Sequence, residues 1–243
     1  MSQSQRFLGV IPARAGSKGI RNKNSRPFCG KPLLQHLSEA AKKSRYIDRL
    51  VLSTESLEIA NLAEKFGIEV PVLRPASLAG DTSNVVDAVL HLLSFLRIRE
   101  KFEPEYLVLL QLTSPFRTTE DIDATIELLL KRNADSAITV CPAEPRVYCK
   151  RDDDSLILLT KKQSSRNINR QTSVQAFREN GCMVYVNRVA VLKKTRSFLG
   201  GKLVGQVIPR WRGVDLDDGE DFVVGEILFN NHKTLDRKIR RFH

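Results

Sequence analysis

Short apolar runs alternate with stretches of helical spacing along the first 140 residues. The runs have the length and composition of buried strands, and they are 6–11, 49–53, 68–73, 106–110 and 136–140. Between them, apolar residues recur at helical intervals in 33–44, 57–66, 85–96 and 118–131. This order predicts an α/β fold of Rossmann-like type, with a mainly parallel sheet flanked by helices.

Polar and glycine residues mark where these elements begin and end. Gly67 stands where a helix C-terminus needs it, Thr118 and Thr119 with Asp121 open another helix, and 81–83 is read as a further helix start. Ligands of such sheets bind beyond the carboxyl ends of the strands. The loops after 11, 73 and 110 are therefore expected to carry the functional site.

The pattern changes after Cys141. Residues 142–175 hold short apolar pieces, many charges and two basic clusters, which predicts an inserted arm after the fifth expected strand instead of another sheet repeat. A strand is expected again at 182–186 and a helix at about 220–230. We expect one domain over 1–243.

The loop after the first expected strand has the chemistry of a phosphate-binding loop. It offers glycines for backbone approach, a hydroxyl and four cations, namely Gly16, Gly19, Ser17, Arg14, Lys18, Arg21 and Lys23. A triphosphate needs backbone N–H donors and cations that follow its oxygens. The spacing matches neither the dinucleotide nor the P-loop pattern. A glycine turn with solvated charges is the structural alternative.

Two later loops add candidates for nucleoside and sugar recognition. Arg74 with 81–83 follows the third expected strand, and the alternative there is a plain helix cap. Gln111, Ser114 and Arg117 follow the fourth. Arg117 has the fork geometry to pair with a carboxylate, and Gln111 can read hydroxyls. The alternative for Arg117 is a solvated charge beside a helix cap.

Two carboxylates near the end of the chain suggest a metal site. In an extended segment Asp215 and Asp217 project to one face. Mg²⁺ prefers oxygen ligands and is commonly held by one or two carboxylates while phosphates and water complete its octahedron. Asp218 and Glu220 fit the alternative role of favouring the positive end of the following helix.

Composition narrows the functional classes. The chain of 243 residues carries a formal net charge of +11, which suits anionic partners, but aromatic residues are only 7% and do not interleave with the basic ones. Its four cysteines form no C-x-x-C pair, and no apolar run is long enough to cross a bilayer. The first residues show no apolar core and no small-residue cleavage site, so we expect no secretion signal. We expect a reduced cytoplasmic protein without structural zinc.

Five motifs, taken together, resemble the acylneuraminate cytidylyltransferases, which make CMP-sialic acid and related CMP-nonulosonic acids. They occur in the family's order and cover nearly the whole chain: Ile11 to Asn24, Arg74 to Thr82, Gln111 to Arg117, Arg178 to Gly181 and Asp215 to Asp218. The resemblance implies a nucleotidyltransferase fold and a Mg²⁺-dependent reaction. In it, the anomeric hydroxyl of a nine-carbon acidic sugar attacks the α-phosphorus of CTP and pyrophosphate leaves. It also implies a homodimer in which the arm reaches the neighbouring site.

The resemblance also implies residue roles, in four groups. The triphosphate loop would be Arg14, Ser17, Lys18, Lys23 and Asn24. The cytidine region would be Arg74, Asp81, Thr82 and Ser83. The sugar side would be Gln111, Ser114, Arg117 and Asn180. The metal carboxylates would be Asp215 and Asp217, and the catalytic residues would be Arg14, Lys18, Lys23 and Asp217.

Two departures and two alternatives remain open. Leu112 and Phe116 stand where the family often has proline and leucine, close to the expected sugar pocket. They bear on which sugar is used: a sialic, legionaminic or pseudaminic acid. The alternative enzyme uses another acidic sugar such as 3-deoxy-octulosonic acid. The alternative from another class is a nucleic-acid-binding protein, whose binding would collapse with salt and need no CTP.

Overall fold

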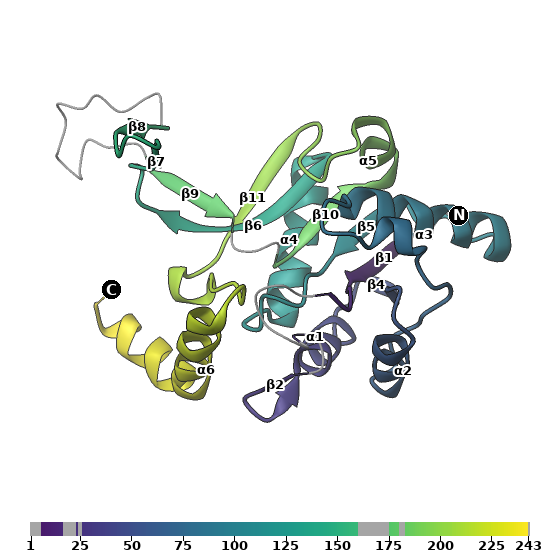
Figure 1. Cartoon of the computed structure of the whole chain (residues 1–243), viewed down its shortest axis with the longest axis horizontal. Coiled ribbons are helices and arrows are strands. Elements are labelled where there is room, and N and C mark those ends of the chain that lie inside the picture. Colours follow the sequence, from purple (N-terminus) through teal and green to yellow (C-terminus); the bar gives the residue numbers. More distant parts are fainter. Residues whose placement is uncertain (1–5, 17–22, 24–25, 160–174, 180–182, 243) are drawn as a thin grey trace.

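The computed structural model describes residues 6–16, 23, 26–159, 175–179 and 183–242 (Figure 1). Its centre is a seven-stranded sheet in the order β11-β6-β10-β5-β1-β4, with β9 paired to β6. The strands are β1 Phe7–Pro12, β4 Ile47–Ser53, β5 Tyr106–Leu109, β6 Ser136–Ala143, β9 Ala176–Glu179, β10 Tyr185–Arg188 and β11 Leu203–Val207. β1 is parallel to β4 and β5, and β11 is parallel to β6. β10 is antiparallel to both of its neighbours. The expected mainly parallel sheet is confirmed.

Helices cover both faces of this sheet, as expected for an α/β fold. One face packs against α1 Leu33–Ala41, α2 Leu57–Lys65, α4 Thr119–Arg132 and α6 Gly219–Ile239. The other packs against α3 Val85–Glu100 and α5 Val189–Thr195. Alternation along β1 produces this division: Phe7 and Ile11 join the first core, whereas Leu8 and Val10 join the second.

Short elements complete the described chain. They are the hairpin strands β2 Pro27–Phe28 and β3 Lys31–Pro32, and the 3-10 turns η1 Ala76–Leu78, η3 Arg210–Arg212 and η4 Arg240–Phe242. Periodicity did not reveal these pieces, nor did it reveal β11 or α5, because each is too short to establish a repeat. No helix in the described ranges has the length and apolar character needed to span a membrane.

Two local expectations are wrong. Residues 68–73 form no strand beyond a single parallel bridge between Val51 and Glu69. Pro71 lacks the N–H that a longer ladder needs. Residues 81–83 are also not the start of α3: they lie within a turn in which Ser83 N–H donates to Gly80 O, 3.0 Å away. Asn84 caps α3 instead, by accepting from Val86 N–H. The predicted start of α4 is confirmed, because Thr118 and Asp121 form a capping box.

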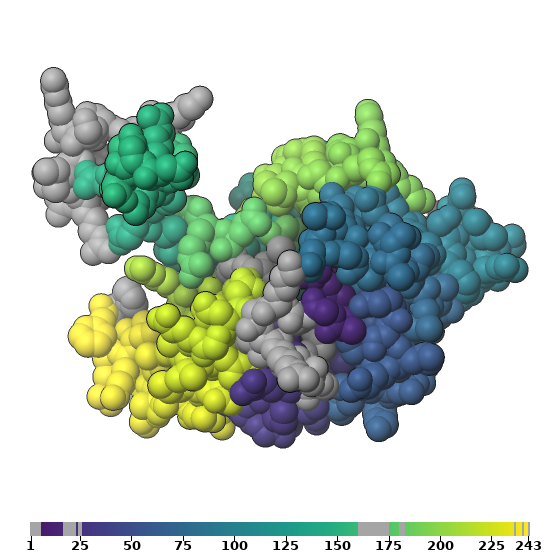
Figure 2. Space-filling model, viewed as in Figure 1, coloured from purple at the N-terminus to yellow at the C-terminus, as the bar shows by residue number. Residues whose placement is uncertain are grey.

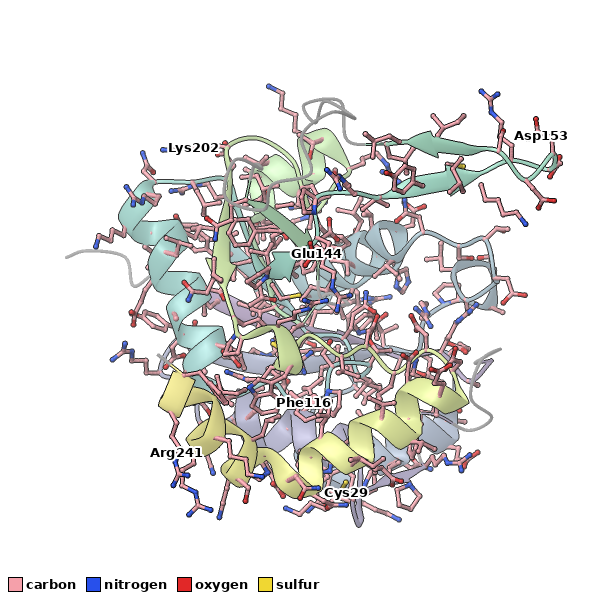
Figure 3. The ribbon with its side chains drawn as sticks, turned by 90° about the vertical axis from the view of Figure 1, so that its left-hand side faces the viewer. Cys29, Phe116, Glu144, Asp153, Lys202 and Arg241 are labelled. Atoms are coloured by element: carbon pink, nitrogen blue, oxygen red, sulfur yellow. The ribbon has the colours of Figure 1, made fainter. Side chains whose placement is uncertain are left out.

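The arm expected after the fifth strand begins as an extension of the main sheet. β6 continues to Ala143, and β9 pairs with that outer end. Beyond it, β7 Tyr148–Lys150 and β8 Leu156–Leu158 form a hairpin that projects away from the body (Figures 1 and 2). Asp153 lies at its far tip (Figure 3). Residues 160–174 lie outside the described chain. That the arm mediates dimerisation stays a prediction.

Candidate active site

A cavity of about 390 Å³ lies beyond the carboxyl ends of β1 and β5. Its wall comes from the loop after β1, the segment before α3, the loop after β5 and the segment before α6. The lining residues are Pro12, Ala13, Arg14, Lys23, Arg74, Leu78, Ala79, Gly80, Asp81, Ser83, Val85, Gln111, Leu112, Thr113 and Asp217. Seven of the residues singled out from the sequence therefore meet around one space: Arg14, Lys23, Arg74, Asp81, Ser83, Gln111 and Asp217.

Arg14 and Asp81 connect two of these walls. The Arg14 guanidinium donates to the Asp81 carboxylate at 2.8 Å, between the loop after β1 and the turn before α3. Both side chains are partly exposed. A cation expected to hold phosphate and an acid expected near the nucleoside are thus paired with each other at the cavity wall. Thr82 is exposed and does not line the cavity.

Arg74 is buried, with 5% of its side chain exposed. Its Nη2 donates to the Glu55 carboxylate at 2.6 Å and to the Ala13 carbonyl at 3.3 Å. Burial raises the pKa of Glu55, but hydrogen bonds from Arg74 and from the Ala15 N–H outweigh burial, so the pKa lies below its usual value. Glu55 was not singled out from the sequence, where it is one acid among many between a strand and a helix.

The acidic segment before α6 is anchored by its middle residue. Leu216 is fully buried, and its N–H donates to the Thr113 carbonyl at 2.8 Å. Leu216 points into the core and Asp217 lines the cavity, whereas Asp215 is not among the residues that line it. Lys23 is buried, and its ammonium lies 3.4 Å from the Asp217 carboxylate. These contacts bring a cation and a carboxylate to the same wall.

Asp215 lies deeper than Asp217. Burial raises its pKa, and the nearby carboxylates of Asp217 and Asp221 act in the same direction. A side-chain hydrogen bond with Thr113 and the charge of Lys23 oppose that rise. One oxygen, Asp215 Oδ1, is buried without a hydrogen-bond partner within the described structure. A buried carboxylate oxygen without a donor is a candidate ligand for a cation.

Asp218 and Asp221 stabilise the N-terminus of α6. Asp218 accepts from the N–H groups of Glu220 and Asp221, and Asp221 accepts from the N–H groups of Asp217 and Asp218. Asp218 thus caps α6 with Asp221 as its reciprocal partner, and Glu220 lies in the first turn of the helix, where its charge favours the positive end. This capping box fixes the backbone on which Asp217 stands.

Ser114 and Arg117 lie away from the cavity. Arg117 is buried and donates to the main-chain carbonyls of Met183 and Gln111, so it holds the end of β5 against the start of β10. Both residues line a small neighbouring crevice together with Leu33, His36, Leu37, Leu112 and Pro115. Within the described contacts, Arg117 braces the strand that presents Gln111. The remaining predicted site residues, Ser17, Lys18, Asn24 and Asn180, lie outside the described chain.

Comparison with known proteins identifies the family. The cytidylyltransferase family matches residues 8–199. The chain belongs to this family. It is 35% identical over 193 residues to the CMP-N,N'-diacetyllegionaminic acid synthase of Legionella pneumophila, covering 79% of this chain and 82% of that one. It is 31% identical over 220 residues to the N-acylneuraminate cytidylyltransferase of Escherichia coli O18:K1:H7, where the match covers 89% of this chain and half of the relative.

Two further matches extend over almost the whole chain. A pseudaminic acid cytidylyltransferase of Campylobacter jejuni is 26% identical over 232 residues, which cover 93% of this chain and 98% of that one. Among solved structures, a CMP:2-keto-3-deoxy-manno-octonic acid synthetase complexed with CTP superposes with a TM-score of 0.72 at 16% identity, covering 94% of this chain and all of that one. At that identity the match establishes the nucleotidyltransferase fold alone. This cytidylyltransferase is accordingly a nucleotidyltransferase by family, and its fold is similar to that of the solved synthetase.

Proposed function

We propose that this cytidylyltransferase transfers CMP from CTP to the anomeric hydroxyl of a nine-carbon acidic sugar and releases pyrophosphate. The observation that carries the proposal is the cavity wall, where Arg14, Lys23, Arg74 and Asp217 converge beyond the ends of two parallel strands. Such a wall suits a ligand that carries both phosphates and hydroxyls. The names of the curated relatives supply the base and the sugar class.

The nine-carbon class is favoured over 3-deoxy-octulosonic acid. Three of the relatives, at 35%, 31% and 26% identity, are named for legionaminic, N-acylneuraminic and pseudaminic acids. The octonic acid synthetase shares only 16% identity, so the match supports a common fold but gives no information about the sugar. Leu112, buried at the cavity wall, is a position at which the three sugars could be distinguished.

The cations have an electrostatic role in this reaction. Attack on the α-phosphorus moves negative charge onto the departing pyrophosphate, and fixed cations aimed at that charge lower the barrier. Lys23, which lies beside Asp217, would supply such a charge, and Arg14 would join it on leaving Asp81 for a phosphate. Lys18 is assigned the same task from the sequence alone.

Asp215 and Asp217 are the residues that would hold Mg²⁺. The fit rests on the donor set: the buried Asp215 Oδ1 has no hydrogen-bond partner in the described structure, and Asp217 lines the cavity. Two carboxylates leave room for phosphate oxygens and water, as Mg²⁺ requires. When bound, the ion neutralises phosphate charge and lowers the pKa of a coordinated hydroxyl. No histidine lines the cavity in the described part of the chain, and we assign no general base.

The remaining expectations join this proposal. The arm would pair two copies and reach the neighbour's site. Apolar side chains exposed on it support a partner there: Val147, Tyr148, Leu156, Ile157, Leu159 and Phe177. We also propose that the enzyme acts in the cytoplasm, in the biosynthesis of surface glycans. Nucleic-acid binding has no support from the cavity.

Pyrophosphate release tests the proposal. The protein is incubated with CTP, Mg²⁺ and, separately, N-acetylneuraminic, legionaminic, pseudaminic and 3-deoxy-octulosonic acids. Release with one nonulosonic acid, abolished by chelating the metal, supports the proposal and names the sugar. Release with 3-deoxy-octulosonic acid alone favours the alternative enzyme. Absence of CTP binding would overturn the proposal.

A further inference from the structure

Glu55 connects three segments that build the cavity wall. It follows β4, immediately before Ser56, which caps α2. One carboxylate oxygen, Oε1, accepts from the Ala15 N–H at 2.7 Å, and the other, Oε2, accepts from Arg74 Nη2 at 2.6 Å. Ala15 belongs to the loop after β1, and Arg74 to the segment before α3. Glu55 does not itself line the cavity.

The backbone around Glu55 strengthens these connections. The Arg74 N–H donates to the Thr54 carbonyl at 2.7 Å, and the Ala13 N–H donates to the Ser53 carbonyl at 3.0 Å. Both neighbouring segments are therefore tied to the end of β4 by main chain as well as by the Glu55 side chain. Glu55 lies in the short connection between β4 and α2, and these main-chain hydrogen bonds fix the position of that connection relative to both segments.

The Arg74 guanidinium depends on this anchorage. Its Nη2 donates hydrogen bonds to both the Glu55 carboxylate and the Ala13 carbonyl. Its Nε is buried without a hydrogen-bond partner within the described structure. The side chains of Glu55 and Arg74 are 18% and 5% exposed, whereas those of the surface pair Glu39 and Lys31 are 46% and 43% exposed. Loss of a carboxylate at the buried pair leaves a buried charge without compensation, a far larger perturbation than loss at a surface pair.

We propose that Glu55 is a positioning residue for CTP: it holds Arg74 and the Ala15 end of the phosphate loop in the relative placement that the nucleotide requires. The inference rests on the proposed function and adds to it a residue that touches neither substrate nor metal. Glu55 acts through Arg74 and through the Ala15 backbone. Its loss should weaken nucleotide binding and leave sugar recognition on the Gln111 side unchanged.

The test compares Glu55→Gln with Glu39→Gln, which breaks the exposed pair. Glutamine keeps the shape and an acceptor for the Ala15 N–H but removes the charge that holds Arg74. We expect Glu55→Gln to raise the calorimetric Kd for CTP and the KM for CTP on the order of tenfold, with the KM for the sugar unchanged. Glu39→Gln should leave all three constants at wild-type values.

Two further measurements separate positioning from a general loss of structure. Glu55→Asp keeps the negative charge but shortens the side chain by one methylene group. This variant should bind CTP better than Glu55→Gln does. In an Arg74→Met background, Glu55→Gln should add little to the rise in Kd, because the two residues act together. A lower melting temperature with an unchanged Kd for CTP would overturn the inference, as would fully additive effects in the two variants.

Failure of the inference about Glu55 can be distinguished from failure of the proposed function. Calorimetry reads CTP binding without any sugar. If the wild type binds CTP but releases no pyrophosphate with any acid tested, the proposed sugar is wrong while the Glu55 comparison still stands. If the wild type does not bind CTP, both are overturned.

Discussion

The cavity wall and the arm differ in which side chains they bury and which they expose. At the wall, charged groups are buried or paired: Arg74 with Glu55, and Lys23 with Asp217. On the arm, apolar groups are exposed, including Leu156 at 62% and Leu159 at 58%. Buried charges require partners within the chain, whereas exposed apolar side chains require none until something covers them. The described charges at the wall therefore have partners within the chain, whereas the exposed apolar side chains of the arm are the surface that the proposed second copy would cover.

The most severe way to break the wall is to remove a metal carboxylate. We expect Asp217→Asn to lower turnover on the order of a thousandfold, because a ligand of the proposed Mg²⁺ is lost. Asp218→Asn is the matched control: asparagine still caps α6, so turnover should stay near wild type. Initial rates of pyrophosphate release measure both. Equal losses in the two variants would mean that the segment matters only for folding.

Removing the buried cation should have the next largest effect. Lys23→Met keeps the length and apolar stem of the side chain but removes the charge beside Asp217. We expect kcat to fall about a hundredfold, since a fixed charge aimed at the leaving pyrophosphate is lost. Lys31→Met, which breaks the exposed pair with Glu39, should leave kcat unchanged. Full activity of Lys23→Met would remove this residue from the mechanism.

A charged substitution on the arm tests whether its exposed apolar side chains form a contact between two copies. Leu156→Asp should raise the dimer dissociation constant at least about tenfold, because a buried contact between copies would then contain an unpaired carboxylate. Leu57→Asp makes the same change at an equally exposed position on α2, where no interface is proposed. Sedimentation equilibrium measures both. A monomeric wild type, or identical behaviour of the two variants, would contradict the role given to the arm.

The smallest expected effect is a pH dependence of stability. The folded pKa of Glu55 lies below the unfolded value of 4.5, so the ionised carboxylate stabilises the fold above that value. The contribution is lost as the pH falls from 4.5 through the folded pKa. Wild type should melt about 2–4 °C above Glu55→Gln at pH 7, and the difference should shrink below pH 4.5. A difference that stays constant at all pH values would exclude this ion pair as its source.

Local patterns were sufficient to predict most of the fold and part of the wall. Strand and helix order follow from periodicity, and Thr118 with Asp121 is a capping signal contained within four residues. Asp217 was predicted from the alternation of an extended segment, and the structure buries Leu216 beside it. The run 68–73 misled, because apolar character alone does not show that Pro71 lies where a ladder would need a donor.

What the sequence could not supply are contacts between distant segments. Glu55 lies 40 residues from Ala15 and 19 from Arg74, so nothing local marks it. Arg117 was expected to face substrate, but one of its partners is the carbonyl of Met183, 66 residues away. An isolated arginine in a motif has the same appearance whether it meets a ligand or main-chain carbonyls. The hydrogen bond to Met183 depends on the packing of β5 against β10, which no local pattern shows.

Phosphorus NMR of one reaction mixture tests the central claim most directly. With CTP, Mg²⁺ and the nonulosonic acid that gives pyrophosphate release, we expect a new phosphodiester resonance to grow in step with pyrophosphate, one for one. That result means that CMP has been transferred to the sugar hydroxyl. Pyrophosphate accompanied by the phosphomonoester signal of free CMP would mean hydrolysis instead of transfer, and would contradict the account.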